Sequence, residues 1–477
     1  MAADAAAQAG GPGGRTVRVA IVGTGAIARG SHLPALAALA TEQPLEVVAA
    51  VDVDAAAAAA FCREGGIPHP YTDMDRMLAE QRPDLVVLCT PPRFHRDQTV
   101  AALRAGAWVW CEKPPCPSLA DFDAIEAEEG GPGRDSGPYA AIVFQHRFGS
   151  GARHVGELLA SGALGRPLVA HCQTTWYRDA AYYAVPWRGR WDTEGGGPSM
   201  GHGIHQMDLL LDLLGPWSEI SAMAGRLVHD VQTEDVSTAL IRFGGGTLAT
   251  VVNSVLSPDE VSRIRVDCER ATVELTHLYG YGNADWRITP APGIPDEEVA
   301  RWREFGPDEP SSHLAQLRGL LADLRAGRRP RSSGADGRKS LELVAALYKS
   351  AFTGVTVRSG DIAPGDPFYG ALHGGTPGWA PRASAPEDPR SARIPGQSPV
   401  PGPERAEGGD PTALPGPERV EGSGPAPAPG LEPPAGAGPP AGPGPEPAGG
   451  AGPATAPGPD PTGGADAVVA PHRRGAR

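Results

Sequence analysis

The sequence predicts an α/β protein with two packed domains and a long low-complexity tail. Three observations support this fold class. Short β-branched runs alternate with helical patterns between residues 17 and 111, which is typical of a parallel sheet covered by helices. After about residue 140, several runs alternate apolar and polar residues, as strands with one exposed face do. From residue 381 onward, Pro, Gly and Ala dominate, and such a segment cannot bury enough apolar surface to offset its ordering entropy.

Composition divides the 477 residues into four parts. We expect an unstructured N-terminus at 1–15, a first domain at 16–138, a second domain at 139–368 and a disordered tail at 369–477. About half of the 52 prolines fall in the tail, and its glycines do not recur at every third position, which excludes a collagen-like helix. The length outside the tail is sufficient for two hydrophobic cores.

Composition also excludes several classes of partner. The net charge is −14 and no long basic cluster is present, so we expect no nucleic-acid partner. The N-terminus lacks the apolar stretch of a signal peptide, and no apolar run approaches the roughly twenty residues of a membrane span. The six cysteines show neither metal-type nor disulfide-type spacing. These features predict a cytoplasmic protein with reduced thiols and no membrane partner.

The first expected strand, at residues 17–22, leads directly into a glycine loop. The loop reads Gly23-Thr24-Gly25-Ala26-Ile27-Ala28 and matches the pattern G-x-G-x-x-A of dinucleotide-binding sites. Gly23 permits the tight turn, Gly25 lets the backbone approach a pyrophosphate, and Ala28 allows close contact between strand and helix. The helix that follows would aim its N-terminal amides at the phosphates. The loop residues expected to contact a dinucleotide are Gly23, Gly25, Ala26 and Ile27.

The second expected strand, at residues 45–51, ends at an acidic residue. The carboxylate of Asp52 would accept hydrogen bonds from the adenosine ribose hydroxyls. Val53 and Asp54 follow, so no arginine is present there to pair with a 2′-phosphate. This pattern favours NAD over NADP as the cofactor, with NADP remaining possible.

The next two expected strands, at 85–89 and 107–111, end in polar motifs at the same edge of the sheet. Ligands of open α/β sheets bind at the carboxyl ends of the strands. His95 opens the helix that follows the first of these strands, and its other interpretation is a turn residue that faces solvent. The cofactor-binding candidates at this edge are Thr90, Pro91, His95, Glu112 and Lys113.

Lysine is almost absent from the chain. Only Lys113, Lys339 and Lys349 remain among 42 lysines and arginines. Arginine stays protonated under nearly all conditions, whereas a lysine can have its pKa lowered and exchange a proton. Lys113 is therefore a candidate for proton transfer, unless the three lysines survive by chance and this one caps an element.

A second set of polar residues lies on an apolar helix expected at 200–214, after the break Gly195-Gly196-Gly197-Pro198. His202, His205 and Asp208 recur every three residues and so lie on overlapping faces. Asp208 could orient the imidazole of His205 and favour its protonated form. Two other interpretations are core histidines satisfied by the backbone and ligands of a zinc ion. The helix lacks an outside ligand set, so we expect no metal.

Aromatic and arginine side chains cluster just before this glycine run. Aromatic rings and guanidinium donors suit a hydroxyl-rich ring with apolar faces, although an ordinary aromatic connection between strand and helix has the same composition. The cluster consists of Trp176, Tyr177, Arg178, Tyr182, Tyr183, Trp187 and Arg188.

Together these motifs make the chain resemble the Gfo/Idh/MocA oxidoreductases, the family of glucose–fructose oxidoreductase and inositol dehydrogenase, from about residue 17 to 357. The motifs that carry the resemblance, in chain order, are the Gly23 loop with Asp52, Thr90-Pro91-Pro92 with His95, Glu112-Lys113-Pro114, Phe144-Gln145-His146-Arg147-Phe148, Trp187-Arg188-Gly189 with the glycine run, His205-Gln206-Met207-Asp208, and the closing helix at 340–350. The resemblance implies an N-terminal Rossmann domain, a C-terminal α/β domain with a large, mostly antiparallel open sheet, and a homodimer or homotetramer.

The resemblance also implies roles for particular residues. His205 aligns with the catalytic base of the family, and Lys113, with a cis bond to Pro114, would hydrogen-bond the reacting oxygen and share in the proton relay. The residues expected to bind substrate are Arg147, Tyr183, Trp187, Arg188, His202 and Asp208, with Arg147 alternatively anchoring the domain interface. One position departs from the family pattern: four residues before the histidine, many members carry an Asp that contacts the lysine and the substrate, and this chain has Gly201.

These expectations combine into one functional hypothesis. The chain is an NAD(P)-dependent dehydrogenase or reductase that acts on a secondary alcohol or ketone of a sugar, sugar derivative or cyclitol. Two alternatives remain: an NAD-dependent lyase or glycoside hydrolase with transient oxidation, and a non-catalytic nucleotide-dependent sensor. The sensor alternative rests on Gly201, because the carboxylate that would tune Lys113 is missing.

Overall fold

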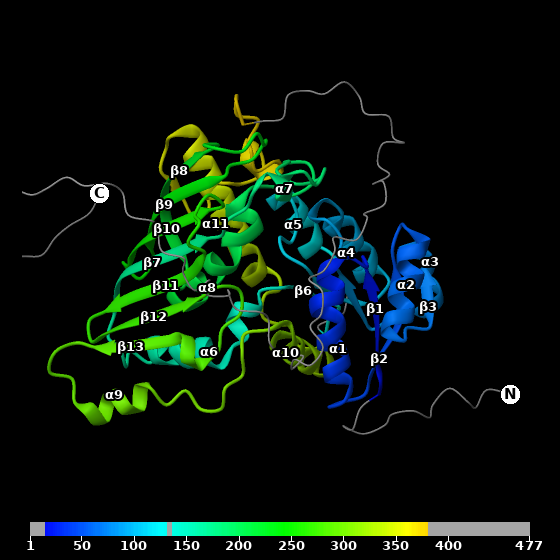
Figure 1. Cartoon of the computed structure of the whole chain (residues 1–477), viewed down its shortest axis with the longest axis horizontal. Helices are drawn as coiled ribbons and strands as arrows, with labels where there is room; N and C mark the ends of the chain where they lie inside the picture. The colour runs from blue at the N-terminus through cyan, green and yellow to red at the C-terminus, as the bar shows by residue number, and fades with distance from the viewer. Residues whose placement is uncertain (1–14, 131–135, 380–477) are drawn as a thin grey trace, which may run out of the picture. The chain divides into compact units, whose positions relative to one another are not determined.

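The computed structural model describes residues 15–130 and 136–379 of the chain (Figure 1). All but the last residue of the predicted N-terminal segment and most of the predicted tail lie outside the described residues. Among the residues that are described, no helix is long and apolar enough to cross a membrane.

The first sheet has six parallel strands in the order β3-β2-β1-β4-β5-β6. Both of its faces are buried, since Val19 and Ile21 of the first strand enter one hydrophobic cluster and Ala20 and Val22 enter the other. This explains the continuous β-branched runs in the sequence. Its strands are β1 (Val17–Val22), β2 (Leu45–Val51), β3 (His69–Tyr71), β4 (Leu85–Leu88), β5 (Trp108–Cys111) and β6 (Ala140–Ile142). Its helical segments are η1 (Ala28–His32), α1 (Leu33–Ala40), α2 (Ala55–Gly65), α3 (Met74–Gln81), η2 (Pro92–Phe94), α4 (His95–Arg104) and α5 (Leu119–Glu126).

The second sheet has eight strands in the order β13-β12-β11-β7-β10-β9-β8-β14. All neighbouring pairs are antiparallel except β7 with β10, so the predicted mostly antiparallel sheet is confirmed. Its strands are β7 (Pro167–Thr175), β8 (Trp217–Gly225), β9 (Val236–Phe243), β10 (Leu248–Ser254), β11 (Val261–Cys268), β12 (Ala271–His277), β13 (Trp286–Pro290) and β14 (Val357–Arg358).

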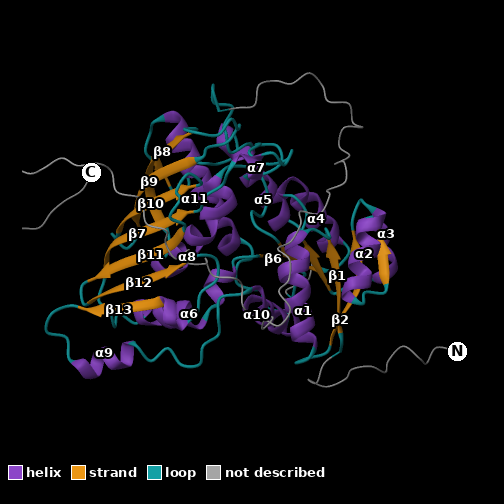
Figure 2. Ribbon diagram, viewed as in Figure 1, coloured by secondary structure: helices purple, strands orange, loops and turns teal. Residues whose placement is uncertain are grey.

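Helices cover one face of this second sheet (Figure 2). α8 packs on β7 and β11, and α11 packs on β8. The opposite face exposes apolar side chains, including Met223, Leu240 and Leu248. The expected homodimer or homotetramer stays a prediction. The helical segments that accompany this sheet are η3 (Gln145–Phe148), α6 (Ser150–Ala160), α7 (Ala180–Tyr183), η4 (Ser199–Gly203), α8 (Ile204–Leu214), η5 (Asn283–Asp285), α9 (Asp296–Trp302), α10 (His313–Ala326), α11 (Ala335–Thr353) and α12 (Pro367–Gly370).

The boundary expected between the domains differs from the structure. β6 follows the predicted boundary at 138, yet it is the edge strand of the first sheet, paired with β5. α10 follows β13 in sequence but lies beside α1 (Figure 1), where Leu317 and Leu321 share a cluster with Leu36 and Leu39. The chain therefore returns to the first domain late, because α10 buries its apolar face there.

Two further expectations are corrected. The helix predicted at 200–214 is a π-helix, η4, followed by the α-helix α8, and a single extra residue per turn leaves no signal in an apolar pattern. The packed domain also continues past the boundary predicted at 368, because Leu372 is buried and the Trp379 ring stacks on Phe352 with centroids 4.1 Å apart.

Candidate functional site

The glycine loop after β1 has the geometry that a dinucleotide requires. Gly23 has φ +91°, and a Cβ there would lie 2.8 Å from the carbonyl carbon of Cys89, so only glycine fits. Gly25 is exposed, and the position of its Cβ has no atom within 4 Å, which leaves the backbone open to a pyrophosphate. Ala26 and Ile27 follow at the start of the helical segment, where amide groups lack partners within the helix.

Asp52 lies at the end of β2 and holds the same loop. Its Oδ2 accepts hydrogen bonds from the amide of Thr24 at 2.9 Å and from its hydroxyl at 2.8 Å. Val53 beside it is 90% exposed. The carboxylate therefore lies at the edge where an adenosine ribose would be bound, and the residues of this site fit a nicotinamide dinucleotide.

His95 is buried and connects the loops that follow β4 and β5. Its Nε2 lies 2.7 Å from the carbonyl oxygen of Thr90, and its Nδ1 lies 2.9 Å from that of Pro114. The interpretation of His95 as a solvent-facing turn residue is wrong, because its side chain is inaccessible to solvent. Pro91 adjoins this loop and is partly buried. The Lys113–Pro114 bond is cis, as expected.

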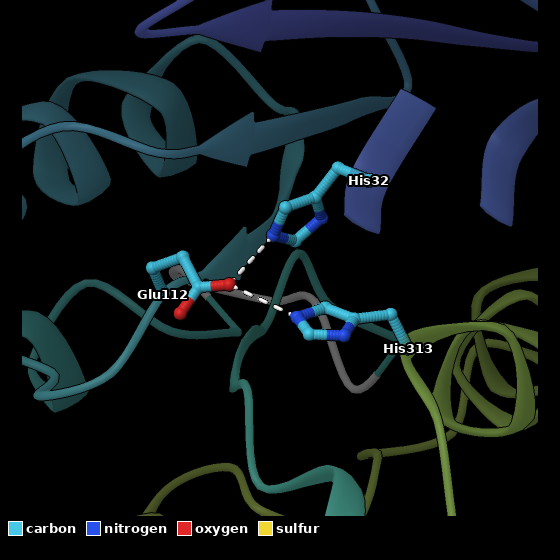
Figure 3. Close-up of side chains that lie close together, drawn as sticks. All are labelled: His32, Glu112 and His313. Atoms are coloured by element: carbon cyan, nitrogen blue, oxygen red, sulfur yellow. Dashed lines mark hydrogen bonds and ion pairs between the residues drawn. The ribbon is translucent and has the colours of Figure 1, made fainter. Parts of the chain in front are cut away.

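Glu112 is held by two histidines from distant elements, His32 of η1 and His313 of α10 (Figure 3). Its Oε1 lies 2.7 Å from Nε2 of His32 and 3.1 Å from Nε2 of His313, and its Oε2 accepts the amide of Lys113 at 3.1 Å. Burial opposes the charge of Glu112, but the hydrogen bonds from His313 and His32 outweigh it and hold the pKa of Glu112 well below its ordinary value.

These three side chains are also a possible metal-ligand set. Ligand atoms around a tetrahedral zinc ion lie about 3.3 Å apart, given zinc–nitrogen distances near 2.0 Å. The nitrogen–oxygen separations of 2.7 and 3.1 Å are instead those of direct hydrogen bonds. We therefore describe the cluster as a hydrogen-bonded network that fixes Glu112 next to Lys113.

Lys113 extends from the first sheet to the π-helix η4. Its Nζ donates a hydrogen bond to the backbone carbonyl oxygen of Gly201 at 2.6 Å. Burial lowers the pKa of Lys113 from its ordinary value, and the positive charges of Arg188 and Arg178 lower it further against the opposing carboxylates of Glu112 and Glu194. The lysine thus contacts the turn that precedes His205, and its role in catalysis stays a prediction.

His205 is buried at the start of α8, and neither of its ring nitrogens has a hydrogen-bond partner among the described residues. Its ring stacks on His146, with centroids 4.9 Å apart. Burial lowers the pKa of His205 well below its ordinary value of 6.5, and the nearby charge of Lys113 lowers it further. The imidazole is therefore neutral at pH 7 and can accept a proton.

Asp208 does not orient His205, contrary to the expectation. Its carboxylate instead accepts hydrogen bonds from the guanidinium of Arg147 and from the hydroxyl of Ser340. Burial opposes the charge of Arg147, yet Asp208 and Asp336 outweigh it and raise the pKa of Arg147. Both partners of the Arg147–Asp208 ion pair are fully buried, so Arg147 anchors η3 to α8 and α11, which favours its interpretation as an anchor over substrate binding by either residue.

Asp208→Asn is expected to lower the free energy of unfolding by about 3–5 kcal/mol, because it leaves a buried guanidinium without its main counterion. Asp323→Asn on α10 is the control, because Asp323 pairs with the exposed Arg328 near the surface, where an ion pair contributes about 1 kcal/mol or less. Urea unfolding of both variants measures the difference. Equal losses would contradict the buried-pair interpretation.

The remaining substrate-binding candidates lie in the segment 183–188 and on η4. Arg188 lies over the rings of Tyr182 and Trp187, at 3.9 and 4.3 Å from their centroids, and pairs with Glu194 at 3.1 Å. Tyr183 packs on His229 with ring centroids 4.6 Å apart. His202 packs against Trp176 at 5.1 Å, and its buried Nδ1 has no partner among the described residues.

Sequence reasoning missed several residues that form this site. His32 and His313 anchor Glu112, while His146 and Tyr279 pack around His205. His146 was visible in a family-like motif, but His32 and His313 had no local signal, since they lie 80 and 201 residues from the carboxylate that they contact.

Sequence comparison finds two matching family models. One, described as "Oxidoreductase family, NAD-binding Rossmann fold", matches residues 17–130. The other, described as "GFO/IDH/MocA C-terminal domain", matches residues 152–274. The two matches fall on the first and second sheets, respectively.

Individual relatives agree with these matches. The D-glucoside 3-dehydrogenase of Escherichia coli K12 is 28% identical over 366 residues, which are 72% of this chain and 97% of that protein. The D-apiose dehydrogenase of Paraburkholderia graminis is 28% identical over 65% of this chain and 82% of that protein. Among solved structures, the WlbA dehydrogenase of Bordetella pertussis in complex with NADH and UDP-GlcNAcA aligns with a TM-score of 0.63 and 26% identity, over 72% of this chain and 98% of that one.

Proposed function

Since the chain belongs to the Gfo/Idh/MocA family of NAD(P)-dependent oxidoreductases, we propose that it oxidises a secondary alcohol of a sugar, sugar derivative or cyclitol, or reduces the corresponding ketone. The relatives named above act on D-glucoside and D-apiose, and a further relative is the myo-inositol 2-dehydrogenase of Thermotoga maritima. These substrates share a ring or chain of hydroxyl-bearing carbons, which suits the aromatic and arginine residues around Lys113.

One observation carries this proposal: Lys113 hydrogen-bonds the turn that precedes His205, and His205 is neutral and has no partner among the described residues. When bound, the nicotinamide supplies the acceptor for hydride. His205 accepts the proton of the substrate hydroxyl, as a general base requires. Lys113 donates a hydrogen bond to the same oxygen and stabilises the negative charge that develops on it.

Glu112 and its two histidines support this arrangement. The network joins η1, the end of β5 and α10 (Figure 3), and it accepts the amide of Lys113. Because Glu112 is buried and fixed by two donors, the backbone at Lys113 is held in one position. The side chain of Lys113 is thereby directed at η4 and the reacting oxygen.

The proposed function is tested by measuring nicotinamide reduction by the purified protein with a panel of cyclitols, aldoses, glycosides and sugar acids. We expect turnover of at least one class with NAD. Tight cofactor binding without any turnover would contradict the dehydrogenase and favour the non-catalytic sensor. Cofactor that stays bound through purification and returns to its starting state during turnover would favour the transient-oxidation mechanism.

NAD is expected to be preferred over NADP by at least about ten-fold in kcat/KM, because a 2′-phosphate would meet the carboxylate of Asp52. Asp52→Ser is expected to narrow this ratio, measured from initial rates with both cofactors. Asp54→Ser is the control, because Asp54 caps α2 through the amides of Ala56 and Ala57. A ratio unchanged by Asp52→Ser would contradict the assignment.

A further inference from the structure

Four other glycines between positions 195 and 203 have a structural reason to be glycine. A Cβ on Gly196 would lie 2.4 Å from the Tyr348 hydroxyl, on Gly197 2.0 Å from the Glu234 carbonyl oxygen, and on Gly203 1.9 Å from Oδ1 of Asn253. Gly195 has φ +78°, which disfavours a side chain. Packing or backbone conformation therefore accounts for each of these four glycines.

Gly201 has no such reason. The position of its Cβ has no atom within 4 Å, Lys113 included, and its φ is not in the left-handed region. Glycine is also one of the weakest helix formers, so its presence inside a helical turn weakens that turn. The residue therefore keeps a space open beside Lys113 without any benefit to the fold that the described residues show.

Positive charge surrounds this space. Lys113 reaches the Gly201 carbonyl oxygen, and none of the described carboxylates lies within 4 Å of its Nζ. The side chains of Arg178 and Arg188 are each 24% exposed. Arg178 and Arg188 both lie over the ring of Tyr182, at 5.3 and 3.9 Å from its centroid, and that ring lies 6.2 Å from the ring of His202, the neighbour of Gly201.

The carboxylates near these cations do not fill the space. Glu194 pairs with Arg188 at 3.1 Å and Glu260 pairs with Arg178 at 3.2 Å, each on an arginine and not on Lys113. Glu194 also acts electrostatically on Lys113, but its carboxylate is bonded to Arg188 and accepts the amide of Gly189 at 2.6 Å. His202 presents a neutral ring whose buried Nδ1 has no partner among the described residues. Among the described residues, no carboxylate lies within 4 Å of the Lys113 ammonium, so the space beside Gly201 has room for an anion from outside the protein.

We propose that Gly201 determines substrate specificity, by leaving room beside Lys113, Arg178 and Arg188 for an acidic substituent of the substrate. The substrate is then a sugar that carries a carboxylate or a phosphate, rather than a neutral sugar. This inference rests on the proposed dehydrogenase function, and it adds the chemical class of the substrate.

The test compares Gly201→Asp with Gly201→Asn, two side chains of the same size that differ in charge. Both variants and the wild-type protein are assayed with three matched sets of sugars: glucose, galactose and mannose, each with its uronic acid and its 6-phosphate. Wild-type protein is expected to show a kcat/KM at least about ten-fold higher for an acidic member than for its neutral partner. Gly201→Asp is expected to reduce that acid-to-neutral ratio at least about ten-fold relative to Gly201→Asn, because a carboxylate within about 5 Å repels the substituent.

The ratio separates this role from a general effect on the lysine. A carboxylate that only altered the pKa of Lys113 would change the rates of acidic and neutral substrates alike, and an unchanged ratio would overturn the proposal. Preference for uronic acids identifies a carboxylate, and preference for the 6-phosphates identifies a phosphate. Melting temperature and NADH binding confirm that both variants fold. Arg178→Gln, expected to lower the same ratio, tests the proposal if Gly201→Asp does not fold.

Failure of this inference is distinguishable from failure of the proposed function. Turnover of neutral sugars without preference for the acids retains the dehydrogenase and overturns the role of Gly201. The second readout is binding of glucuronate, glucose 6-phosphate and glucose to the NADH-loaded protein, followed by nicotinamide fluorescence. A second result is selective binding of the acids without turnover, with that binding lost in Gly201→Asp. It would retain the anion site and overturn the dehydrogenase. If the protein neither turns over any of these sugars nor binds the acids, both the dehydrogenase and the role of Gly201 are overturned.

Discussion

Replacing Lys113 with methionine is expected to lower kcat/KM at least about a thousand-fold on whichever alcohol the protein oxidises best. Methionine approximates the length of the lysine but donates no hydrogen bond, so both the proton relay and the stabilisation of the alkoxide oxygen are lost. Each of these effects alone contributes about a hundred-fold or more. The dissociation constant for NADH, measured by fluorescence titration, is expected to change by only a few-fold, because the glycine loop and Asp52 are intact.

The matched control for this variant is Lys349→Met. Lys349 lies on α11 and pairs with Asp366, which caps α12. It therefore tests whether loss of any lysine lowers activity through stability. Comparable losses in the two variants, or a Lys113→Met enzyme with nearly full activity, would exclude Lys113 from the chemistry.

Replacing His205 with asparagine is expected to lower kcat at least about a hundred-fold, because asparagine cannot accept the hydroxyl proton. The substitution leaves a buried polar side chain in place and so limits the structural change. His171→Asn is the control, since His171 is exposed on the outer face of the second sheet and forms a hydrogen bond with Thr250 there. Steady-state kinetics with both variants distinguishes the two interpretations of His205. If His205 merely fills the core, the kcat of His205→Asn would stay close to the wild-type value.

The two groups also predict the pH profile of kcat/KM. The pKa of His205 is held well below 6.5, so the base stays neutral and activity persists through pH 6, falling only when more acidic solution protonates the ring. The pKa of Lys113 is lowered from 10.5, so the alkaline limb is expected to begin below pH 10.5, where the ammonium loses its proton. A wild-type profile with an acidic limb centred near 6.5 would contradict the buried, neutral His205.

The lowered pKa of His205 also predicts how the free energy of unfolding changes with pH. A histidine with a lowered pKa binds its proton more weakly in the folded state than in the unfolded chain, so the unfolded state gains protons as pH falls below 6.5. His146 and His202 share the direction of this shift. The free energy of unfolding is therefore expected to decrease as pH falls through the ordinary histidine pKa, in step with the number of buried imidazoles.

Much of the first domain was predictable because its signals are local. Val17–Val22 and Leu45–Val51 were predicted with the bounds that the structure shows, since a strand buried on both faces is a continuous apolar run. The edge strands β3 and β6 were not predicted, because three residues are too short for a pattern. β6 was also assigned to the wrong domain, since its pairing with β5 spans about thirty residues of sequence.

The candidate site shows the same division. Gly23, Gly25 and Asp52 were identifiable because a phosphate turn needs particular residues in a fixed local order. Asp208 was misinterpreted for a related reason: its helical spacing from His205 was correct, but spacing states which residues share a face and not which partner a carboxylate chooses. Arg147, 61 residues earlier in the chain, had the stronger attraction, since a buried carboxylate is stabilised most by a charged, two-pronged donor.

The sequence by itself determined the class of the protein and the order of its two sheets, and it selected Lys113 and His205 as candidates for the chemistry, because burial periodicity and short motifs are properties of neighbouring residues. Only the tertiary structure decided what these residues contact. Lys113 meets the carbonyl of Gly201 across 88 residues, and Glu112 meets His313 across 201. Such contacts follow from how the sheets and helices pack, and a buried polar group takes whichever partner that packing brings within about 3 Å.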